Sequence, residues 1–126
     1  MLARLLMFLA AIGLSATLWA QVGHPAKGSW SGYLTPASGE QVRTRLLIEA
    51  WNGELSGTVN PGRNGVKFSS AELDASNWGL TIKAPMPQGE LVLTGTLSNL
   101  GSWTNRKFIG TYTLGSEKGN FEFTLN

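Results

Sequence analysis

The side chains that could take part in catalysis are few and far apart in the sequence. His24 is the single histidine and stands beside Pro25, ahead of the first predicted strand, so we expect a disordered terminal residue and not a general base or metal ligand. A serine nucleophile would then lack a histidine partner within the fold. The chain contains no cysteine, which excludes thiol chemistry and thiolate metal sites.

The acidic residues are spread singly over the chain and form no catalytic pair. Glu72 and Asp74 are two positions apart in a predicted strand, so they share a face and could bind a cation weakly. A solvated strand edge is the favoured interpretation of this pair. No glycine-rich phosphate loop leads into a helix. These observations predict a protein that is not an enzyme and that holds no cofactor and no metal.

The tryptophans carry the clearest pattern after the first twenty residues. Trp30 opens the first predicted strand, Trp51 ends the second, Trp78 begins the fifth, and Trp103 lies in the connection before the seventh. Sequential hairpins would bring all four to one end of a barrel. Trp51 and Trp103 are the candidates for an exposed platform that binds a sugar ring or another apolar ligand, whereas Trp30 and Trp78 are expected in the core. A plug of aromatic rings that closes the barrel floor is the favoured interpretation, and the exposed platform is the alternative.

The opposite end of such a barrel would carry the longer loops, rich in proline and glycine. Arg63 and Lys118 are among the polar residues predicted there, and they are further candidates for contact with a ligand. A small barrel can hold one small ligand inside. The inward residues are bulky, however, so a filled interior is slightly favoured over a pocket.

The first twenty residues resemble a secretory signal peptide. A short basic start precedes an apolar run over 5–14, which is short for a membrane span. Cleavage after Ala20 is favoured, cleavage after Ala16 or Thr17 stays open, and an uncleaved anchor is the alternative. We therefore divide the chain into a signal peptide at 1–20, a flexible segment at 21–27 and a barrel domain at 28–126, and we expect a secreted or periplasmic protein that does not span the membrane once the leader is removed.

The charged residues are scattered, and without Arg4 the mature chain is close to neutral, so nucleic acid is not an expected partner. Apolar residues alternate with polar ones, and turn residues interrupt them every eight to twelve positions. This pattern predicts an all-β fold, a single eight-stranded antiparallel up-and-down barrel. The predicted strands are 28–34, 41–50, 54–60, 65–73, 77–84, 90–98, 106–114 and 119–125.

Four of the predicted strands carry a glycine in the same register. Gly32, Gly57, Gly95 and Gly110 all fall on the inward face. An inward glycine lets a strand bend over its neighbour without a collision at Cβ, as closure of a small sheet requires. We therefore assign these four residues, with Trp30 and Trp78, a structural role.

A third candidate surface lies on the outside of the barrel. The outward apolar residues are Tyr33, Leu47, Val92 and Ile109. Isolated exposed apolar residues are normal, but these four could also form a patch through which the protein makes a homodimer.

The motif Gly28-Ser29-Trp30 resembles the Gly-x-Trp opening of lipocalins and of avidin-like proteins. The mature chain is also similar to small secreted bacterial proteins of unknown function with a Gly-x-Trp-x-Gly-x-Leu start and a Phe-x-Phe-x-Leu finish. The resemblance implies an eight-stranded barrel and binding of a small ligand. Gly32 stands where avidin-like proteins carry a biotin-contacting asparagine, so biotin binding is not carried over. The long helix that lipocalins have before the last strand is also absent, so only the fold and a general ability to bind a ligand are carried over.

The first hypothesis is therefore a secreted, non-enzymatic, lipocalin-like barrel that binds a small apolar or carbohydrate ligand. The second is a domain with a solid core that acts through its surface or as an oligomer, without a small-molecule ligand.

Overall fold

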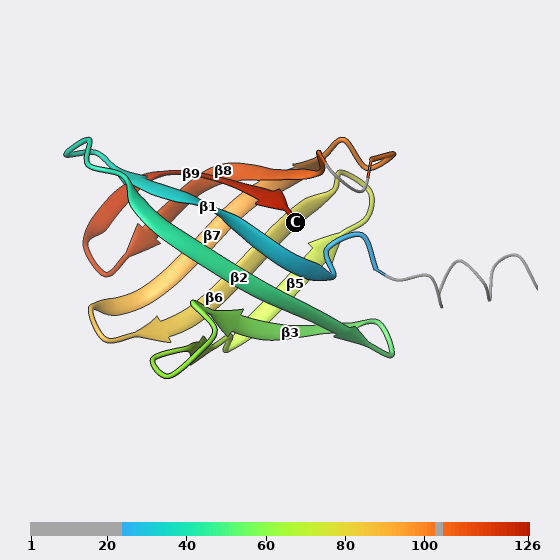
Figure 1. The fold of residues 1–126 in the computed structure, drawn as a ribbon, viewed down its shortest axis with the longest axis horizontal. Coiled ribbons are helices and arrows are strands. Elements are labelled where there is room, and N and C mark those ends of the chain that lie inside the picture. Colours follow the sequence, from blue (N-terminus) through green and yellow to red (C-terminus); the bar gives the residue numbers. More distant parts are fainter. Residues whose placement is uncertain (1–23, 103–104) are drawn as a thin grey trace, which may run out of the picture.

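The computed structural model describes residues 24–102 and 105–126, which form one curled antiparallel sheet of nine strands (Figure 1). The strands are β1 (Gly28–Pro36), β2 (Val42–Trp51), β3 (Glu54–Val59), β4 (Val66–Lys67), β5 (Ser70–Asp74), β6 (Gly79–Met86), β7 (Gly89–Ser98), β8 (Lys107–Leu114) and β9 (Glu117–Leu125). Their spatial order is β4-β3-β2-β1-β9-β8-β7-β6-β5. The all-β prediction is confirmed. No helix in the described part of the chain is long and apolar enough to cross a membrane.

Neighbouring strands pair antiparallel, and most consecutive strands are joined by short turns. The turn between β2 and β3 consists of Asn52 and Gly53, with φ angles of 51° and 79°. Positive φ at both central residues is what a two-residue hairpin of this kind requires, and Asn-Gly adopts it at low cost. The Asn-Gly pair in the sequence thus places this hairpin correctly.

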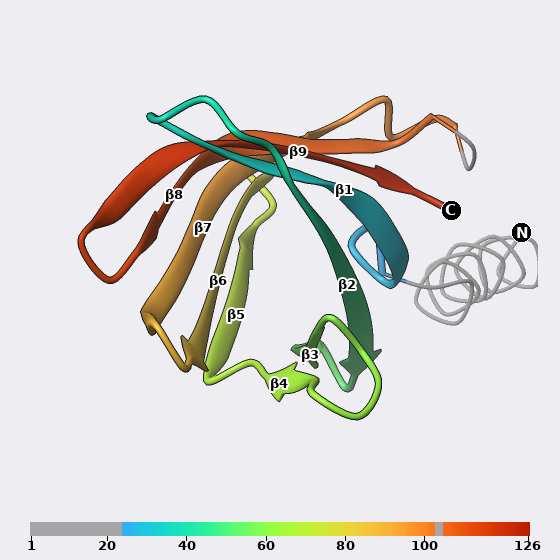
Figure 2. The same cartoon turned by 60° about the vertical axis from the view of Figure 1, so that its left-hand side comes forward.

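The predicted strand 65–73 is in fact two strands, which corrects the prediction of eight strands. β4 pairs with β3 at one edge of the sheet, whereas β5 pairs with β6 at the other edge. The backbone N–H of Phe68 donates to the carbonyl of Gly57 in β3 (2.9 Å), and the next residue, Ser69, donates to the carbonyl of Lys83 in β6 (2.7 Å). The chain therefore steps from one edge to the other and draws the two edges together (Figure 2).

The closure of the barrel is correspondingly incomplete. Along the described residues, β3 and β5 form no strand pair with each other, so the sheet is a curled half-barrel and not a fully hydrogen-bonded cylinder. The prediction of a closed up-and-down barrel is corrected in this respect. Its sequential topology is confirmed on both sides of the crossover.

The inward faces predicted by alternation form the core. Phe108 lies at its centre, with ring centroids 4.7 Å from Phe121, 6.3 Å from Phe123 and 6.4 Å from Trp30. Aliphatic residues from every long strand complete it. Val42 is an exception to the alternation: it has the same parity as the buried Leu46 and Ile48 of β2 but is exposed at the start of the strand. Burial of these large side chains, at about 1.5–3 kcal/mol each, is the main source of stability in a chain without disulfides.

The two predicted ends are also found. Trp30, Trp51 and Trp78 lie at the end that carries the N-terminal turn and the β2–β3 and β5–β6 turns, on the right in Figure 1. The β1–β2, β6–β7 and β8–β9 connections lie at the other end. Trp103 lies outside the described residues.

The four inward glycines stand where strands approach closely. A Cβ atom at Gly32 would overlap the backbone of Glu122 in β9, and a Cβ atom at any of the other three would overlap a carbonyl oxygen of a neighbouring strand. Their absent side chains therefore permit the tight curl of the sheet. Gly119, which was not singled out from the sequence, is equally crowded, with Pro36 Cα 2.8 Å from its Cβ position.

Candidate functional site

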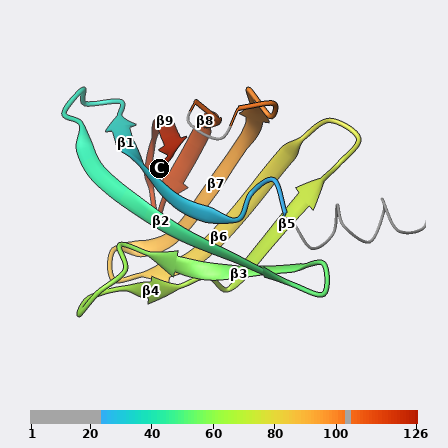
Figure 3. The same ribbon diagram turned by 45° about the vertical axis from the view of Figure 1, so that its right-hand side comes forward.

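The aromatic cluster lies beside β1, β8 and β9, whereas a groove lies at the seam, where β3 and β5 approach each other. The edge strand β5 faces the part of β3 that β4 does not cover (Figure 3). A groove of about 540 Å³ runs between them. The residues that line it are His24, Gly53, Glu54, Leu55, Ser70, Ala71, Glu72 and Leu73. We refer to it as the seam groove.

The seam groove has an apolar floor and a polar rim. Leu55, Ala71 and Leu73 are half-buried and pack against the core, so they form the floor. Glu54 and Glu72 are exposed and alternate with the floor residues along β3 and β5, which places them on the rim. The alternation of inward and outward residues continues along β3 and β5, but their inward residues Leu55, Ala71 and Leu73 are only half-buried.

His24 lies at the tryptophan end of the seam groove and was not expected in the fold. The backbone N–H of Ala26 donates to Nδ1 of His24 (3.1 Å), and the N–H of Lys27 donates to the His24 carbonyl (3.0 Å). Burial lowers the pKa of His24, so its imidazole is neutral at pH 7, and with Nδ1 accepting, its proton lies on Nε2. The residue predicted to be disordered therefore starts a hydrogen-bonded turn. Of the segment 21–27 predicted as flexible, 24–27 belong to the fold, and 21–23 lie outside the described residues.

This N-terminal turn is held by two side chains of the barrel. Nε1 of Trp30 donates to the carbonyl of Ala26 (2.8 Å), and Ala26 is fully buried. The guanidinium of Arg106, 4% exposed, donates to the carbonyls of Pro25 (2.9 Å) and Leu100 (2.6 Å). Burial lowers the pKa of Arg106, but an arginine stays charged at neutral pH. These bonds hold the turn against the barrel, and His24 at its start lines the groove.

Arg106 was missed as a structural residue, although the sequence holds a signal for it. It directly precedes β8 and has the same parity as Phe108 and Gly110, which predicts that it points inward. An arginine at an inward position requires buried acceptors, since a buried charge without partners is costly.

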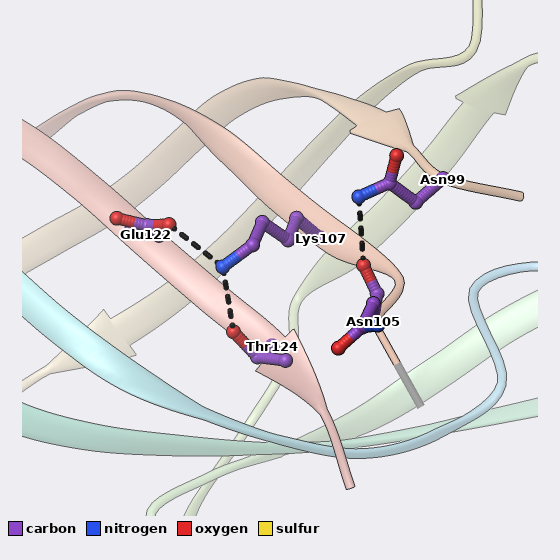
Figure 4. Close-up of polar contacts among 5 residues, drawn as sticks. All are labelled: Asn99, Asn105, Lys107, Glu122 and Thr124. Atoms are coloured by element: carbon purple, nitrogen blue, oxygen red, sulfur yellow. Dashed lines mark hydrogen bonds and ion pairs between the residues drawn. The ribbon is translucent and has the colours of Figure 1, made fainter. Parts of the chain in front are cut away.

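The outer face around the start of β8 is polar (Figure 4). Nζ of Lys107 lies 3.0 Å from Oε1 of Glu122 and 3.5 Å from Oγ1 of Thr124, and Nδ2 of Asn99 donates to the carbonyl of Asn105 (3.0 Å). An exposed ion pair of this kind contributes about 0–1 kcal/mol. The Lys107 contacts join β8 to β9, and the Asn99 bond links the two ends of the connection between β7 and β8.

The structure does not bring the predicted ligand contacts together. Trp51 is 80% exposed at the end of β2, and its pairing partner is Glu54, on the rim of the seam groove. Arg63 and Lys118 are exposed at the opposite end, away from it. Trp78 is half-buried at the turn before β6. Trp103 again lies outside the described residues.

Glu72 and Asp74, the predicted acidic pair, make different contacts in the structure. Asp74 accepts hydrogen bonds from the backbone N–H (2.9 Å) and the hydroxyl (2.5 Å) of Ser76, which lower its pKa and fix the β5–β6 turn. Glu72 lines the seam groove. Within residues 24–102 and 105–126, no group of three or more histidine, cysteine or acidic residues is arranged to hold a metal ion.

The exposure of Trp51 allows a test of the plug hypothesis. We expect Trp51→Ala to leave the free energy of unfolding within about 0.5 kcal/mol of the parent value, because the indole buries little area. Urea unfolding followed by circular dichroism measures this. A large loss of stability would mean that Trp51 closes the barrel floor after all.

No known protein family and no curated protein sequence matches this chain. Among solved structures, a redesigned β-barrel is similar to it, with a TM-score of 0.55 and 14% sequence identity over 81% of this chain and 92% of that chain. At this identity the likeness shows the fold alone. The protein is a small antiparallel β-barrel-like protein, and its function must be argued from its own residues.

Proposed function

We propose that the protein is a non-enzymatic, lipocalin-like barrel that binds a small ligand with an apolar part in the seam groove. The observation that carries the proposal is the groove itself, whose floor gives access to inward apolar side chains. Binding sites for small molecules are concave and largely apolar, with a few polar groups that orient the ligand. Leu55, Ala71 and Leu73 supply the apolar surface, and His24, Glu54 and the other rim residues supply the polar groups.

The seam also offers the flexibility that such a site needs. β3 and β5 are joined through the crossover at Phe68 and Ser69, and not by pairing along their length. A ligand could therefore enter between them without breaking strand hydrogen bonds. The core beside β1, β8 and β9 is packed with large aromatic and aliphatic side chains, which favours a ligand held at the seam.

The leader supports a secreted or periplasmic location for this activity, where an apolar molecule would need a carrier. The sugar-binding version of the proposal depends on Trp51, whose exposed ring lies next to the rim.

A bulky side chain in the floor should abolish binding. We expect Ala71→Phe to raise the Kd for the fluorescent probe N-phenyl-1-naphthylamine at least tenfold, because the added ring occupies the groove. Ala37→Phe is the matched control, since Ala37 is exposed at the opposite end. Titration of probe fluorescence, with circular dichroism to verify folding, measures the effect. Equal Kd values for both variants and the parent would reject the seam groove as the site.

The alternative, a solid domain that acts through its surface, has one observation in its favour. Tyr33 and Ile109 are 45% and 44% exposed, and both pair with Glu122 across β1, β9 and β8. Native mass spectrometry of protein purified gently from its own host separates the two proposals. Bound small-molecule mass lost on denaturation supports a carrier, whereas a bare dimer supports association through the Tyr33 and Ile109 face.

A further inference from the structure

The charge of the seam groove distinguishes among ligands. Of the described residues that line it, Glu54 and Glu72 are the ones that carry a charge at pH 7, because burial keeps His24 neutral. One carboxylate lies on each side, on β3 and on β5. The rim is therefore negative on both sides of an apolar floor.

These two carboxylates are not engaged within the protein. Across residues 24–102 and 105–126, neither Glu54 nor Glu72 forms an ion pair or a side-chain hydrogen bond. The nearest lysines in register are Lys83, which pairs with Ser70, and Lys67, which pairs with Thr58, and neither lines the groove. A cationic ligand group would thus meet two carboxylates that form no ion pair within the described part of the protein.

From this we infer that the ligand is an organic cation, an apolar body that carries a protonated amine. The inference rests on the proposed function and adds the chemical class of the ligand. The floor would hold the apolar body, while Glu54 and Glu72 would hold the ammonium group. The indole of Trp51, exposed and paired with Glu54 across the hairpin, offers a further attraction to a cation through its ring face. An anionic ligand of the same shape would be repelled by both sides of the rim.

Three probes with one apolar body test the inference. We would measure 4-phenylbutylamine, 4-phenylbutan-1-ol and 4-phenylbutyrate by isothermal titration calorimetry and by displacement of N-phenyl-1-naphthylamine. The amine should bind about tenfold more tightly than the alcohol, which corresponds to about 1.4 kcal/mol, and the carboxylate should bind most weakly. The advantage of the amine should shrink as salt rises from 20 to 500 mM, because the rim is exposed and its charge is screened.

Removing the rim charges should remove the preference and leave the groove. In the double variant Glu54→Gln with Glu72→Gln, the amine and the alcohol should bind with Kd values within about twofold of each other, because neither ligand then meets a charged rim. Glu90→Gln removes an exposed carboxylate at the opposite end and should keep the full preference. Glu54, Glu72 and Glu90 are all exposed, so both variants are expected to fold.

The outcomes separate the two proposals. If the alcohol binds as tightly as the amine in the parent protein, the cation inference is overturned and the seam groove stands as an apolar site. If the amine binds but fails to displace the fluorescent probe, its site lies elsewhere and the inference also fails. If none of the probes binds, the proposed function fails, and the inference with it.

Discussion

Replacing Gly95 by valine is expected to cost this protein several kcal/mol of stability. A Cβ atom at position 95 would lie 2.5 Å from the carbonyl oxygen of Ile109 and 2.7 Å from Cζ of Phe121. The first contact is backbone of the adjacent strand β8, so no side-chain rotation relieves it. Overpacking of a core typically costs about 1–3 kcal/mol and occasionally more. Because two rigid contacts are violated at once, we expect a loss of about 3 kcal/mol and a drop in Tm of more than about 10 °C.

A glycine without neighbours provides the control for this prediction. Gly101 has no atom within 4 Å of its Cβ position and no positive φ, so Gly101→Val should melt within about 2 °C of the parent. Gly57→Val should behave like Gly95→Val, since its Cβ would overlap the carbonyl of Leu47 and approach Phe68 at 2.5 Å. Differential scanning calorimetry of the three variants measures the contrast. If Gly57→Val and Gly95→Val melt like the parent, the close approach of strands at these glycines is not the reason for their positions.

The faces of the strands could be predicted because each strand here has one side in the core and one in water. Under that condition, apolar residues at every second position are the buried ones, and the polar residues between them are exposed. Leu46 and Ile48 in β2, or Phe121 and Phe123 in β9, are buried while their neighbours are not. The ends of the barrel followed from the same information, since hairpin connections alternate between two ends.

The crossover was missed, although a sign of it is present in the sequence. Val66 and Phe68 are inward at even positions, whereas Ala71 and Leu73 are inward at odd positions. A single strand cannot change parity, so the slip at Ser69 and Ser70 requires a break or a bulge. We interpreted the stretch 65–73 as one strand because its length and composition are ordinary for a strand.

The seam groove could not be predicted from the sequence. Its existence depends on how far β3 and β5 diverge beyond the crossover, and that distance is set by the curl of all nine strands together. Leu55 and Leu73 have the sequence pattern of ordinary core residues. Glu54 and Glu72, eighteen positions apart, have the pattern of ordinary surface residues, and only the meeting of the two sheet edges places them on one rim.

The N-terminal turn shows a second limit of sequence patterns. Residues 24–27 lack any periodicity, and a histidine beside a proline before the first strand is typical of a flexible end. Their order comes from side-chain hydrogen bonds to their carbonyls, one from Trp30 four positions along the chain and one from the distant Arg106. Such bonds join residues up to 81 positions apart, and no local rule detects them.

Truncating Trp30 to alanine should be as damaging as crowding Gly95, and for the opposite physical reason. Trp30 is fully buried, packs edge-on against Phe108 and donates Nε1–H to the carbonyl of Ala26. Removal of a buried tryptophan ring typically costs about 3–5 kcal/mol, since it leaves a cavity. The carbonyl of Ala26 also loses its donor, which adds a desolvation cost of about 1–3 kcal/mol where no water replaces it. We therefore expect Trp30→Ala to lose at least about 3 kcal/mol of unfolding free energy, measured by urea denaturation.

The variant Trp30→Phe distinguishes the contribution of ring packing from that of the Nε1–H hydrogen bond. This variant retains most of the packing against Phe108 but removes the hydrogen-bond donor, so we expect a smaller loss of unfolding free energy, about 1–2 kcal/mol. The amide of Lys27 donates to the carbonyl of His24 within the turn. We therefore also expect faster hydrogen exchange at this amide. Because the turn carries His24 to the seam groove, the same variant should weaken binding of N-phenyl-1-naphthylamine. Trp51→Ala, at the same end of the barrel but exposed, should change neither stability nor exchange at Lys27. Unchanged exchange in Trp30→Phe would show that Arg106 alone holds the turn, and that the indole of Trp30 contributes to this end of the barrel through packing only.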